Sequence, residues 1–235
     1  MSNSLEVEAV FVSYDEPMAD ALFRRAGERL GMPIKRLHGV HGVGKAYRLT
    51  AELVDAEWFF LVDADCYISE DFDPACIDAI GLDRPRVIVW RSRNPVNGLE
   101  YGYGGLKLCS VEAMKRIVPM PGADPLANIE TEFLNQVACT TNFNQSPFHA
   151  WRSGLREVLT LLANDFGLQQ SEIEDRVRGW VDVAFDVPFA EWARQGALDA
   201  VATWDRDPHG MCVEIGNPTS LSAAFSEWYP GVVQQ

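Results

Sequence analysis

Short apolar runs alternate with longer amphipathic stretches over the first hundred residues of the chain. The run at 9–13 predicts a strand that is buried on both faces, as strands of parallel sheets usually are. The stretch after it has helical spacing up to about Leu30, with Asp15 as the expected cap and Pro17 in the first turn. The chain is therefore expected to begin with a strand followed by a helix.

The same alternation continues further along the chain. A short strand is predicted at 34–37, a helix at 45–54, and buried strands at 58–62 and 86–90. Strands and helices that alternate in this way are joined by right-handed crossovers. We therefore predict an α/β fold with a doubly wound, mostly parallel sheet, whose ligands bind outside the carboxyl ends of the strands.

From Phe148 onward the apolar spacing is helical. The predicted helices span 148–164, 171–185 and 189–202. The tail after Trp204 is rich in proline, glycine and serine and is expected to have no regular structure. We therefore predict a catalytic core at 1–147 and a helical C-terminal extension at 148–235 that packs on it.

Composition narrows the classes of function. The formal net charge of −14 argues against a protein that holds nucleic acid mainly through a broad basic surface. The five cysteines lack Cys-x-x-Cys spacing and predict neither a zinc site nor a disulfide framework. No apolar stretch reaches the roughly 20 residues that cross a bilayer, and the first residues do not resemble a secretory signal. We therefore expect a cytoplasmic protein.

Two carboxylates, Asp63 and Asp65, follow the predicted strand at 58–62. They should lie at the edge of the sheet where ligands bind, and Asp15 should reach the same edge after the first strand. Mg²⁺ and Mn²⁺ take one or two protein carboxylates and leave positions for water and phosphate oxygens. The pair therefore suits a metal that holds a diphosphate, although Asp-x-Asp at a strand end can also serve only as a cap.

A glycine-rich segment at 101–108 is the next candidate for a ligand contact. Glycines allow the backbone to approach a ligand closely, and the two tyrosines of the segment could border a sugar. We expect Gly104, Gly105 and Lys107 to contact the bound donor. The alternative for the segment is a tight hairpin or bulge with aromatic packing. Lys107 could touch phosphate or the acceptor, and the alternative for it is a surface role.

Three segments together resemble the nucleotide-binding half of a GT-A glycosyltransferase. They are Val12 to Asp15, Gly44 to Arg48, and Phe60 to Asp65. The resemblance implies that Asp15 meets the nucleotide, that Lys45 or Arg48 approaches it, and that Asp63 with Asp65 binds the metal. It also implies a glycosyltransferase that uses Mn²⁺ or Mg²⁺ and a nucleotide-sugar donor, with a UDP-sugar favoured.

Further segments, at 94–98, 101–107 and 142–152, resemble bacteriophage-type glycosyltransferases, including those that decorate hydroxymethylated pyrimidines in DNA. This resemblance implies a 5-hydroxymethyl pyrimidine in phage DNA as acceptor, modified in the host cytoplasm. The acidic composition counts against DNA as a substrate.

The GT-A resemblance also implies a third metal ligand late in the catalytic domain, commonly a histidine. His149 stands at a suitable position, with His38 and His41 as alternatives. A lone histidine in an aromatic setting is more often packed and hydrogen bonded. His209, beside a proline and a glycine, is expected to be a loop residue.

An inverting transferase needs a carboxylate that takes the proton of the acceptor hydroxyl. Asp124, Glu130 and Glu132 lie where such a base often follows the glycine-rich loop, and Glu130 and Glu132 are the preferred candidates. The apolar spacing around them also fits the inward face of a helix, which would make both glutamates ordinary first-turn charges. A retaining enzyme would not require this base.

Other functions remain open on the sequence alone. A glycan and a small metabolite are the alternative acceptors. A nucleotidyltransferase would usually carry a basic glycine-rich loop after the first strand, where this chain has Tyr14 to Pro17. A non-catalytic module that binds a nucleotide sugar is the third alternative, and the oligomeric state is not predicted.

Overall fold

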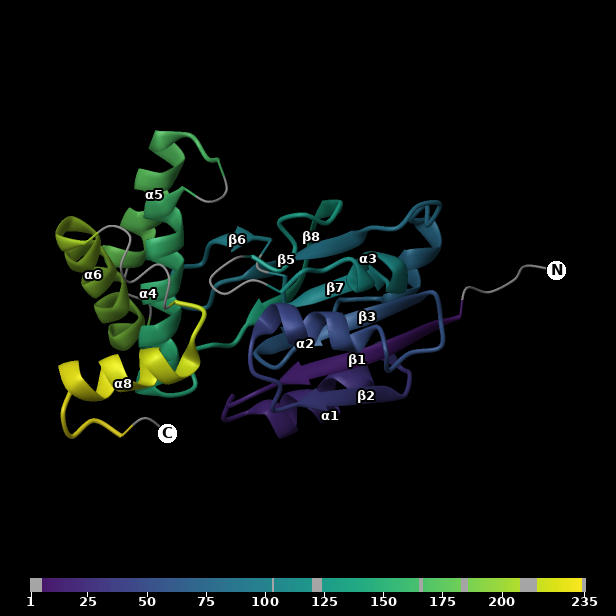
Figure 1. The fold of residues 1–235 in the computed structure, drawn as a ribbon, viewed down its shortest axis with the longest axis horizontal. Coiled ribbons are helices and arrows are strands. Elements are labelled where there is room, and N and C mark those ends of the chain that lie inside the picture. Colours follow the sequence, from purple (N-terminus) through teal and green to yellow (C-terminus); the bar gives the residue numbers. More distant parts are fainter. Residues whose placement is uncertain are drawn as a thin grey trace. The chain divides into compact units, whose positions relative to one another are not determined.

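The computed structural model describes residues 6–102, 104–119, 124–164, 167–182, 186–207 and 215–233 of the chain (Figure 1). It divides into two compact units. The first comprises Met1–Arg93 and Glu100–Thr141, and the second comprises Asn94–Leu99 and Asn142–Gln235. By their packing, residues 94–99 and 142–147 therefore group with the helical unit and not with the core that we expected at 1–147.

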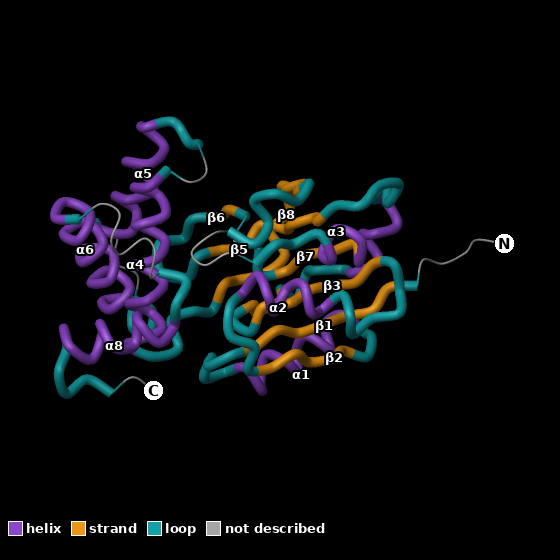
Figure 2. Tube along the Cα trace, in the orientation of Figure 1, coloured by secondary structure: helices purple, strands orange, loops and turns teal. Residues whose placement is uncertain are grey.

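The first unit consists of helices and one eight-stranded sheet (Figure 2). Its first half alternates strands with helices: β1 (Val7–Ser13), α1 (Ala19–Leu30), β2 (Ile34–His38), α2 (Val43–Thr50) and β3 (Trp58–Asp63). Its second half contains β4 (Cys66–Ile68), the 3-10 helix η1 (Pro74–Ala79), β5 (Val87–Arg93), β6 (Glu100–Tyr101), β7 (Leu106–Ser110), α3 (Val111–Lys115) and β8 (Thr131–Thr141).

The strand order is β2-β1-β3-β7-β5-β8-β4, with β6 paired to β5. β1 is parallel to β2 and β3, and β5 is parallel to β8. Because β7 is antiparallel to both of its neighbours, β3 and β5, the five strands β1, β2, β3, β5 and β8 run in the same direction. The predicted α/β fold with a mostly parallel sheet and C-terminal helices is confirmed.

Both faces of the sheet are covered by helices. Successive side chains of a strand point to opposite faces. Phe11 of β1 therefore belongs to one core, together with Leu22 of α1. Its neighbour Val10 belongs to the other core, together with Tyr47 of α2 and Met114 of α3. This two-sided burial explains why β1 and β3 are apolar along almost their whole length.

Several element boundaries differ from those predicted. Helix α1 begins at Ala19, and its N-cap Met18 makes no side-chain capping bond, so Asp15 and Pro17 lie in the loop before the helix. Helix α2 spans Val43–Thr50 instead of 45–54. The helical interpretation of the segment around Glu130 and Glu132 was wrong, because Thr131–Thr141 forms strand β8, which hydrogen-bonds to β5 and β4.

The second unit is helical. Its helices are α4 (Pro147–Ala163), α5 (Gln170–Val181), α6 (Ala190–Arg206) and α8 (Pro218–Trp228). The prediction of an irregular tail was wrong, because α8 lies within it. The polar residues there start a helix: the side chain of Asn217 accepts hydrogen bonds from the backbone N–H groups of Thr219 and Ser220, and Pro218 occupies the first turn.

A partly buried carboxylate links three parts of this helical unit. Asp199 of α6 accepts hydrogen bonds from the indole Nε1 of Trp151, at 2.7 Å, and from the hydroxyl of Tyr229. Gln195, one turn earlier on α6, donates to the other carboxylate oxygen at 3.0 Å. The network therefore joins α4, α6 and the segment after α8.

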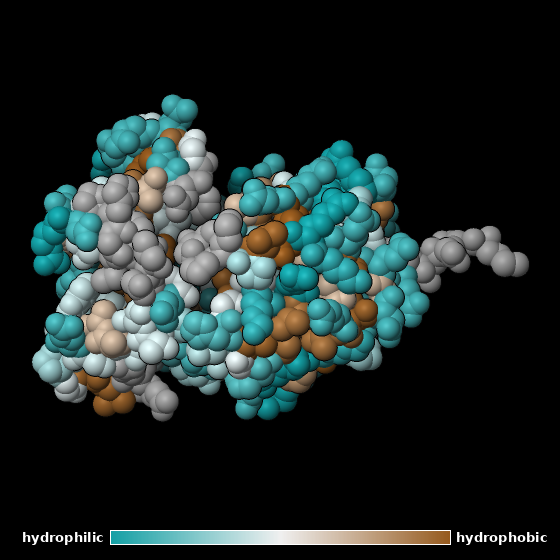
Figure 3. Space-filling view, viewed as in Figure 1, coloured by the Kyte–Doolittle hydropathy of each residue, from teal (hydrophilic) through white to brown (hydrophobic). Residues whose placement is uncertain are grey.

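Exposed apolar side chains are spread over several elements and loops. The large ones among the described residues are Tyr14, Met18, Val43, Tyr67, Val118, Phe133, Leu198 and Val233. On the face drawn in Figure 3, apolar and hydrophilic areas are interspersed over the first unit. No helix in the described part of the chain is both long and apolar enough to cross a bilayer.

Helices α4 and α6 cross with their backbones in contact. A Cβ added to Gly154 would overlap the carbonyl oxygen of Ala193, and one added to Gly196 would overlap that of Trp151. We expect Gly154→Ala to destabilise the protein by about 3 kcal/mol, at the upper end of the usual overpacking range. Urea denaturation followed by circular dichroism measures the change.

Gly179→Ala in α5 is the matched control for this crossing. Its new methyl group would meet the end of the Leu99 side chain at 3.3 Å, a contact that a rotamer change relieves. Alanine favours a helix over glycine by up to about 1 kcal/mol, so this variant should be as stable as the wild type or more so. Equal losses in both variants would contradict the close crossing.

Candidate functional site

The carboxyl ends of β1, β2 and β3 lie side by side. The end of the sheet at which these strands terminate is called its carboxyl edge. Asp63, the last residue of β3, is in register with Val12 of β1, and Ser13 of β1 is in register with His38, the last residue of β2. Asp15 and Asp65 follow these strand ends in the chain. The structure therefore brings the predicted acidic residues to the edge where α/β sheets bind ligands.

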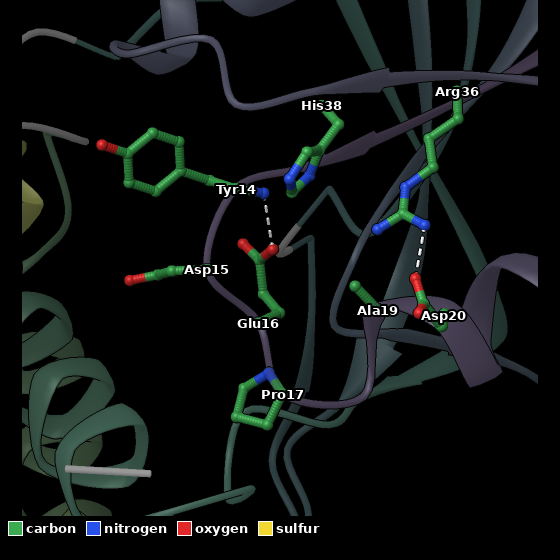
Figure 4. Close-up of a pocket in the computed structure, with 8 residues that line it drawn as sticks. All are labelled: Tyr14, Asp15, Glu16, Pro17, Ala19, Asp20, Arg36 and His38. Carbon is green, nitrogen blue, oxygen red and sulfur yellow. Dashed lines mark hydrogen bonds and ion pairs between the residues drawn. The ribbon is translucent and has the colours of Figure 1, made fainter.

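A cavity of about 500 Å³ opens at this edge, beside the end of β1 (Figure 4). It is lined by Tyr14, Asp15, Glu16, Pro17, Ala19, Asp20, Arg36 and His38. Tyr14 and Asp15 point to the same side of the loop, and His38 lies between Tyr14 and Arg36. The cavity thus combines an aromatic ring with hydrogen-bond donors and acceptors.

Ion pairing holds Arg36 in the wall of this cavity. Its guanidinium contacts the carboxylate of Asp20 at 2.5 Å and donates to the hydroxyl of Ser13 at 2.9 Å. The same hydroxyl lies 3.0 Å from Nδ1 of His38. The hydrogen bond from Arg36 lowers the pKa of Asp20, so this carboxylate is ionised at neutral pH. Sequence reasoning missed Arg36, although a charged residue within a short strand was a visible signal.

Asp63 is held by two side chains from other elements. Lys107 of β7 places its Nζ 2.8 Å from Oδ2 of Asp63, and the hydroxyl of Tyr47 donates to both carboxylate oxygens at 2.9 Å. The Lys107 side chain is 2% exposed and that of Asp63 is 25% exposed. Lys107 therefore lies behind the carboxylate, and Asp63 retains an exposed side.

The two partners of Asp63 have strongly shifted pKa values. Burial alone would lower the pKa of Lys107, but the charge of Asp63 and the contact with Tyr47 outweigh burial, and the pKa is raised. Burial first, and then the negative charge of Asp63, raises the pKa of Tyr47. Lys107 is therefore a cation and Tyr47 a neutral hydrogen-bond donor over the whole physiological pH range.

Gly104 and Gly105 pack around this group. Gly104 has φ +72°, and a Cβ at this position would lie 2.9 Å from Cε of Lys107. The carbonyl oxygen of Gly105 accepts the backbone N–H of Asp63 at 3.0 Å. The glycine-rich segment thus reaches the Asp63 edge as expected, although contact of Gly104, Gly105 or Lys107 with a donor stays a prediction. Tyr103, in the same segment, lies outside the described residues.

Asp65 is partly buried and precedes the buried Cys66. A Cβ on Gly105 would lie 3.4 Å from Sγ of Cys66 and 3.5 Å from Sγ of Cys139, so the two thiols lie close together. Burial raises the pKa of Cys66, and its hydrogen bond to Cys139 lowers the pKa of Cys139. Cys66 is buried, as expected for a small core residue. Cys212 is not among the described residues.

Asp63 and Asp65 offer hard oxygen ligands that suit Mg²⁺ or Mn²⁺. The described residues contain no group of three or more His, Cys, Asp or Glu side chains placed to hold a metal. Mg²⁺ usually needs only one or two carboxylates when a substrate phosphate supplies further oxygens. The residues present therefore fit a metal that is shared with a diphosphate and do not form an all-protein cage.

The predicted basic residues of α2 lie on its outer side. Tyr47 faces the core, whereas Lys45 and Arg48 are exposed. The helical period explains this, since the buried residues Ala46, Tyr47 and Thr50 form one stripe with spacing of three to four, and Lys45 and Arg48 fall outside it. The structure gives neither residue a contact with Asp63, and their approach to a nucleotide stays a prediction.

The candidate bases lie at the other end of the sheet, at the amino ends of the parallel strands. Thr131 at the start of β8 is in register with Val87 at the start of β5, so Glu130 and Glu132 are at the amino ends of these strands. Glu130 pairs with Arg84 at 2.8 Å, and Glu132 pairs with Arg86 at 3.0 Å. The structure does not bring these glutamates to the edge that holds Asp63.

The predicted histidine ligand belongs to the second unit. His149 lies in the first turn of α4, is 6% exposed, and has its Nδ1 2.8 Å from the hydroxyl of Ser146. His38 and His41 lie in the first unit and are exposed, and His41 contacts the ring of Tyr14 edge to face. A ligand role for His149 stays a prediction. His209 lies outside the described residues.

No protein-family model and no curated protein matches the chain. Among solved structures, a mannosyltransferase, PcManGT from Pyrobaculum calidifontis, solved with GDP-Man and Mn²⁺, aligns at 13% identity over 95% of this chain and 81% of its own, with a TM-score of 0.48. HddC from Yersinia pseudotuberculosis aligns at 13% identity over 56% of this chain and 70% of its own, with a TM-score of 0.38.

A third solved structure, the inositol-1-phosphate CTP transferase from T. maritima, aligns at 14% identity over 77% of this chain and 79% of its own, with a TM-score of 0.37. The names of these proteins include both a glycosyltransferase and a nucleotidyl-group transferase. At these identities and TM-scores the likenesses do not place the chain in a family.

Proposed function

We propose that the chain is a metal-dependent glycosyltransferase that moves a sugar from a nucleotide-diphosphate donor to a hydroxyl acceptor. The observation that carries the proposal is the sheet edge where Asp63 and Asp65 lie beside the cavity of Tyr14, Asp15 and Arg36. A nucleotide sugar needs a site for a polar heterocycle next to a site for a charged diphosphate. A cavity next to two carboxylates within one α/β unit supports such a pair of sites.

The proposed roles follow from position and chemistry. The cavity holds the nucleoside, with Tyr14 against the base and Asp15 as a hydrogen-bond acceptor. Asp65 and the exposed side of Asp63 hold Mn²⁺ or Mg²⁺ against the diphosphate, where the ion supplies charge stabilisation to the leaving group. Gly105 approaches this place through its backbone, while Lys45 and Arg48 face solvent on α2.

The acceptor and the base of the donor are the finer part of the proposal. A 5-hydroxymethyl pyrimidine in phage DNA and a UDP-sugar remain the specific hypotheses, and both rest on the sequence resemblance. The general base is not assigned, because Arg84 and Arg86 hold Glu130 and Glu132 at the far edge of the sheet.

Asp65→Ala tests the donor site. In the wild type, a nucleotide sugar at about 100 times its Kd should raise the free energy of unfolding by about 2.7 kcal/mol, and only with Mn²⁺ present. The variant should lose this gain because the metal loses its ligand. Thermal unfolding against UDP- and GDP-sugars, with and without Mn²⁺, measures the effect.

Asp78→Ala is the control for this experiment, because Asp78 is an exposed carboxylate in η1. Its response to donor and metal should equal that of the wild type. Stabilisation by nucleoside triphosphates but by no nucleotide sugar would instead favour a nucleotidyltransferase. Stabilisation that does not depend on Mn²⁺ would contradict the metal role.

Tyr14→Ala tests the nucleoside cavity separately from the metal. Loss of an aromatic ring from a base commonly costs about 1–3 kcal/mol, so the donor Kd should rise about fivefold or more. Tyr14 is 37% exposed, so the free energy of unfolding without ligand should change little. Calorimetric titration with the donor and Mn²⁺ measures Kd. Phe133→Ala removes an exposed ring from β8 and is the control, whose Kd should equal that of the wild type. An equal Kd for the Tyr14 variant and the wild type would exclude the proposed contact.

A further inference from the structure

One carboxylate of the proposed metal site is already paired with a cation of the protein. Lys107 forms an ion pair with Asp63 at 2.8 Å and is 2% exposed. Asp63, Asp65 and Lys107 together carry a net charge of −1, whereas the two carboxylates alone would carry −2. A divalent ion that binds here therefore meets less negative charge than the sequence motif suggests.

The fold fixes Lys107 in this position. Its strand β7 pairs with β3, where Lys107 is in register with Leu61, two residues before Asp63. The Nζ atom lies 4.6 Å from the centre of the Tyr47 ring, a distance typical of a cation–π contact. Gly104 leaves no room for a side chain beside Cε of Lys107. Lys107 is therefore a built-in charge and not a mobile surface lysine.

A fixed cation affects two properties of the site. It orients the Asp63 carboxylate, together with the Tyr47 hydroxyl, which donates to both of its oxygens. It also repels a second cation, because charges in a partly buried site are screened less than they are in water. A diphosphate adds negative charge at the same place and offsets this repulsion.

We propose that Lys107 is a positioning residue that makes metal binding depend on the diphosphate. The protein alone binds a divalent cation weakly, and metal and nucleotide diphosphate enter the site together. Asp63 is then shared between Lys107 and the metal, and Asp65 adds a second carboxylate. This inference rests on the proposed function, since it assigns a diphosphate-bound metal to this edge.

Mn²⁺ binding without nucleotide tests the proposal. Free Mn²⁺ is counted by electron paramagnetic resonance in titrations of the wild type and of Lys107→Met. We expect the variant to bind Mn²⁺ at least tenfold more tightly than the wild type. Lys115→Met, which removes a lysine from an exposed position on α3, should leave the affinity unchanged. Equal Mn²⁺ affinity in the wild type and Lys107→Met would overturn the proposal.

Lys107→Gln covers the case in which the methionine variant fails to fold. Its side-chain amide can still donate to Asp63 but carries no charge, so it separates charge from hydrogen bonding. It should bind Mn²⁺ more tightly than the wild type, as Lys107→Met does. A folded glutamine variant with wild-type affinity would show that the charge does not control the metal.

A second titration separates this inference from the proposed function. With UDP or GDP present, and after correction for the metal–nucleotide complex in solution, wild-type affinity for Mn²⁺ should rise at least tenfold. Mn²⁺ must then tighten nucleotide binding by the same factor, because coupling between two ligands is reciprocal. Nucleotide-sugar binding with no gain in the Lys107 variants would overturn the inference alone. A gain in those variants with no nucleotide binding by the wild type would overturn the proposed function alone.

Discussion

The buried ion pair of Lys107 and Asp63 is the interaction on which the proposed site depends. An ammonium group with 2% exposure needs a nearby counter-charge, because an unpaired buried charge costs several kcal/mol. Asp63 meets this requirement, and in return its carboxylate is held at the end of β3 with one side exposed. Tyr47 completes the arrangement from α2, which covers the same face of the sheet, so that a strand, a neighbouring antiparallel strand and a helix all meet at one carboxylate.

The direction of β7 makes this pairing possible. In a fully parallel sheet, the residue beside the end of β3 would also be the end of its own strand, and its long side chain would reach solvent. Because β7 runs antiparallel to β3, its first residues lie beside the end of β3. Lys107 is the second residue of β7, directly after the glycine segment, and is already buried. The same strand directions place Asp63 and Asp65 at one edge and Glu130 and Glu132 at the other, which divides the acidic residues into a ligand edge and a set of ion pairs.

Much of the sheet could be predicted from local pattern. β1 and β3 are buried on both faces, so their apolar runs identify them, and the position of Asp63 follows from the end of such a run. β8 could not be identified in this way, because its exposed residues break the alternation, while apolar residues at 129, 133 and 137 imitate a helix. The partner of Asp63 was also hidden, since Lys107 lies 44 residues away in the chain and a lysine among glycines suggests a surface loop. The acidic sheet edge was therefore predictable and its counter-charge was not.

The contact of α4 with α6 limits how the sequence can change during evolution. Where two helix backbones touch, the only side chain that fits is a hydrogen atom, so Gly154 and Gly196 are constrained by what they lack. Hydrophobic residues around them can exchange for one another over evolutionary time, because volume-conserving swaps in a core are tolerated. A glycine at a backbone contact has no such substitute. Divergent homologues that keep this helix pair should therefore retain both glycines long after the surrounding sequence has become unrecognisable, which makes the two positions a durable marker of ancestry.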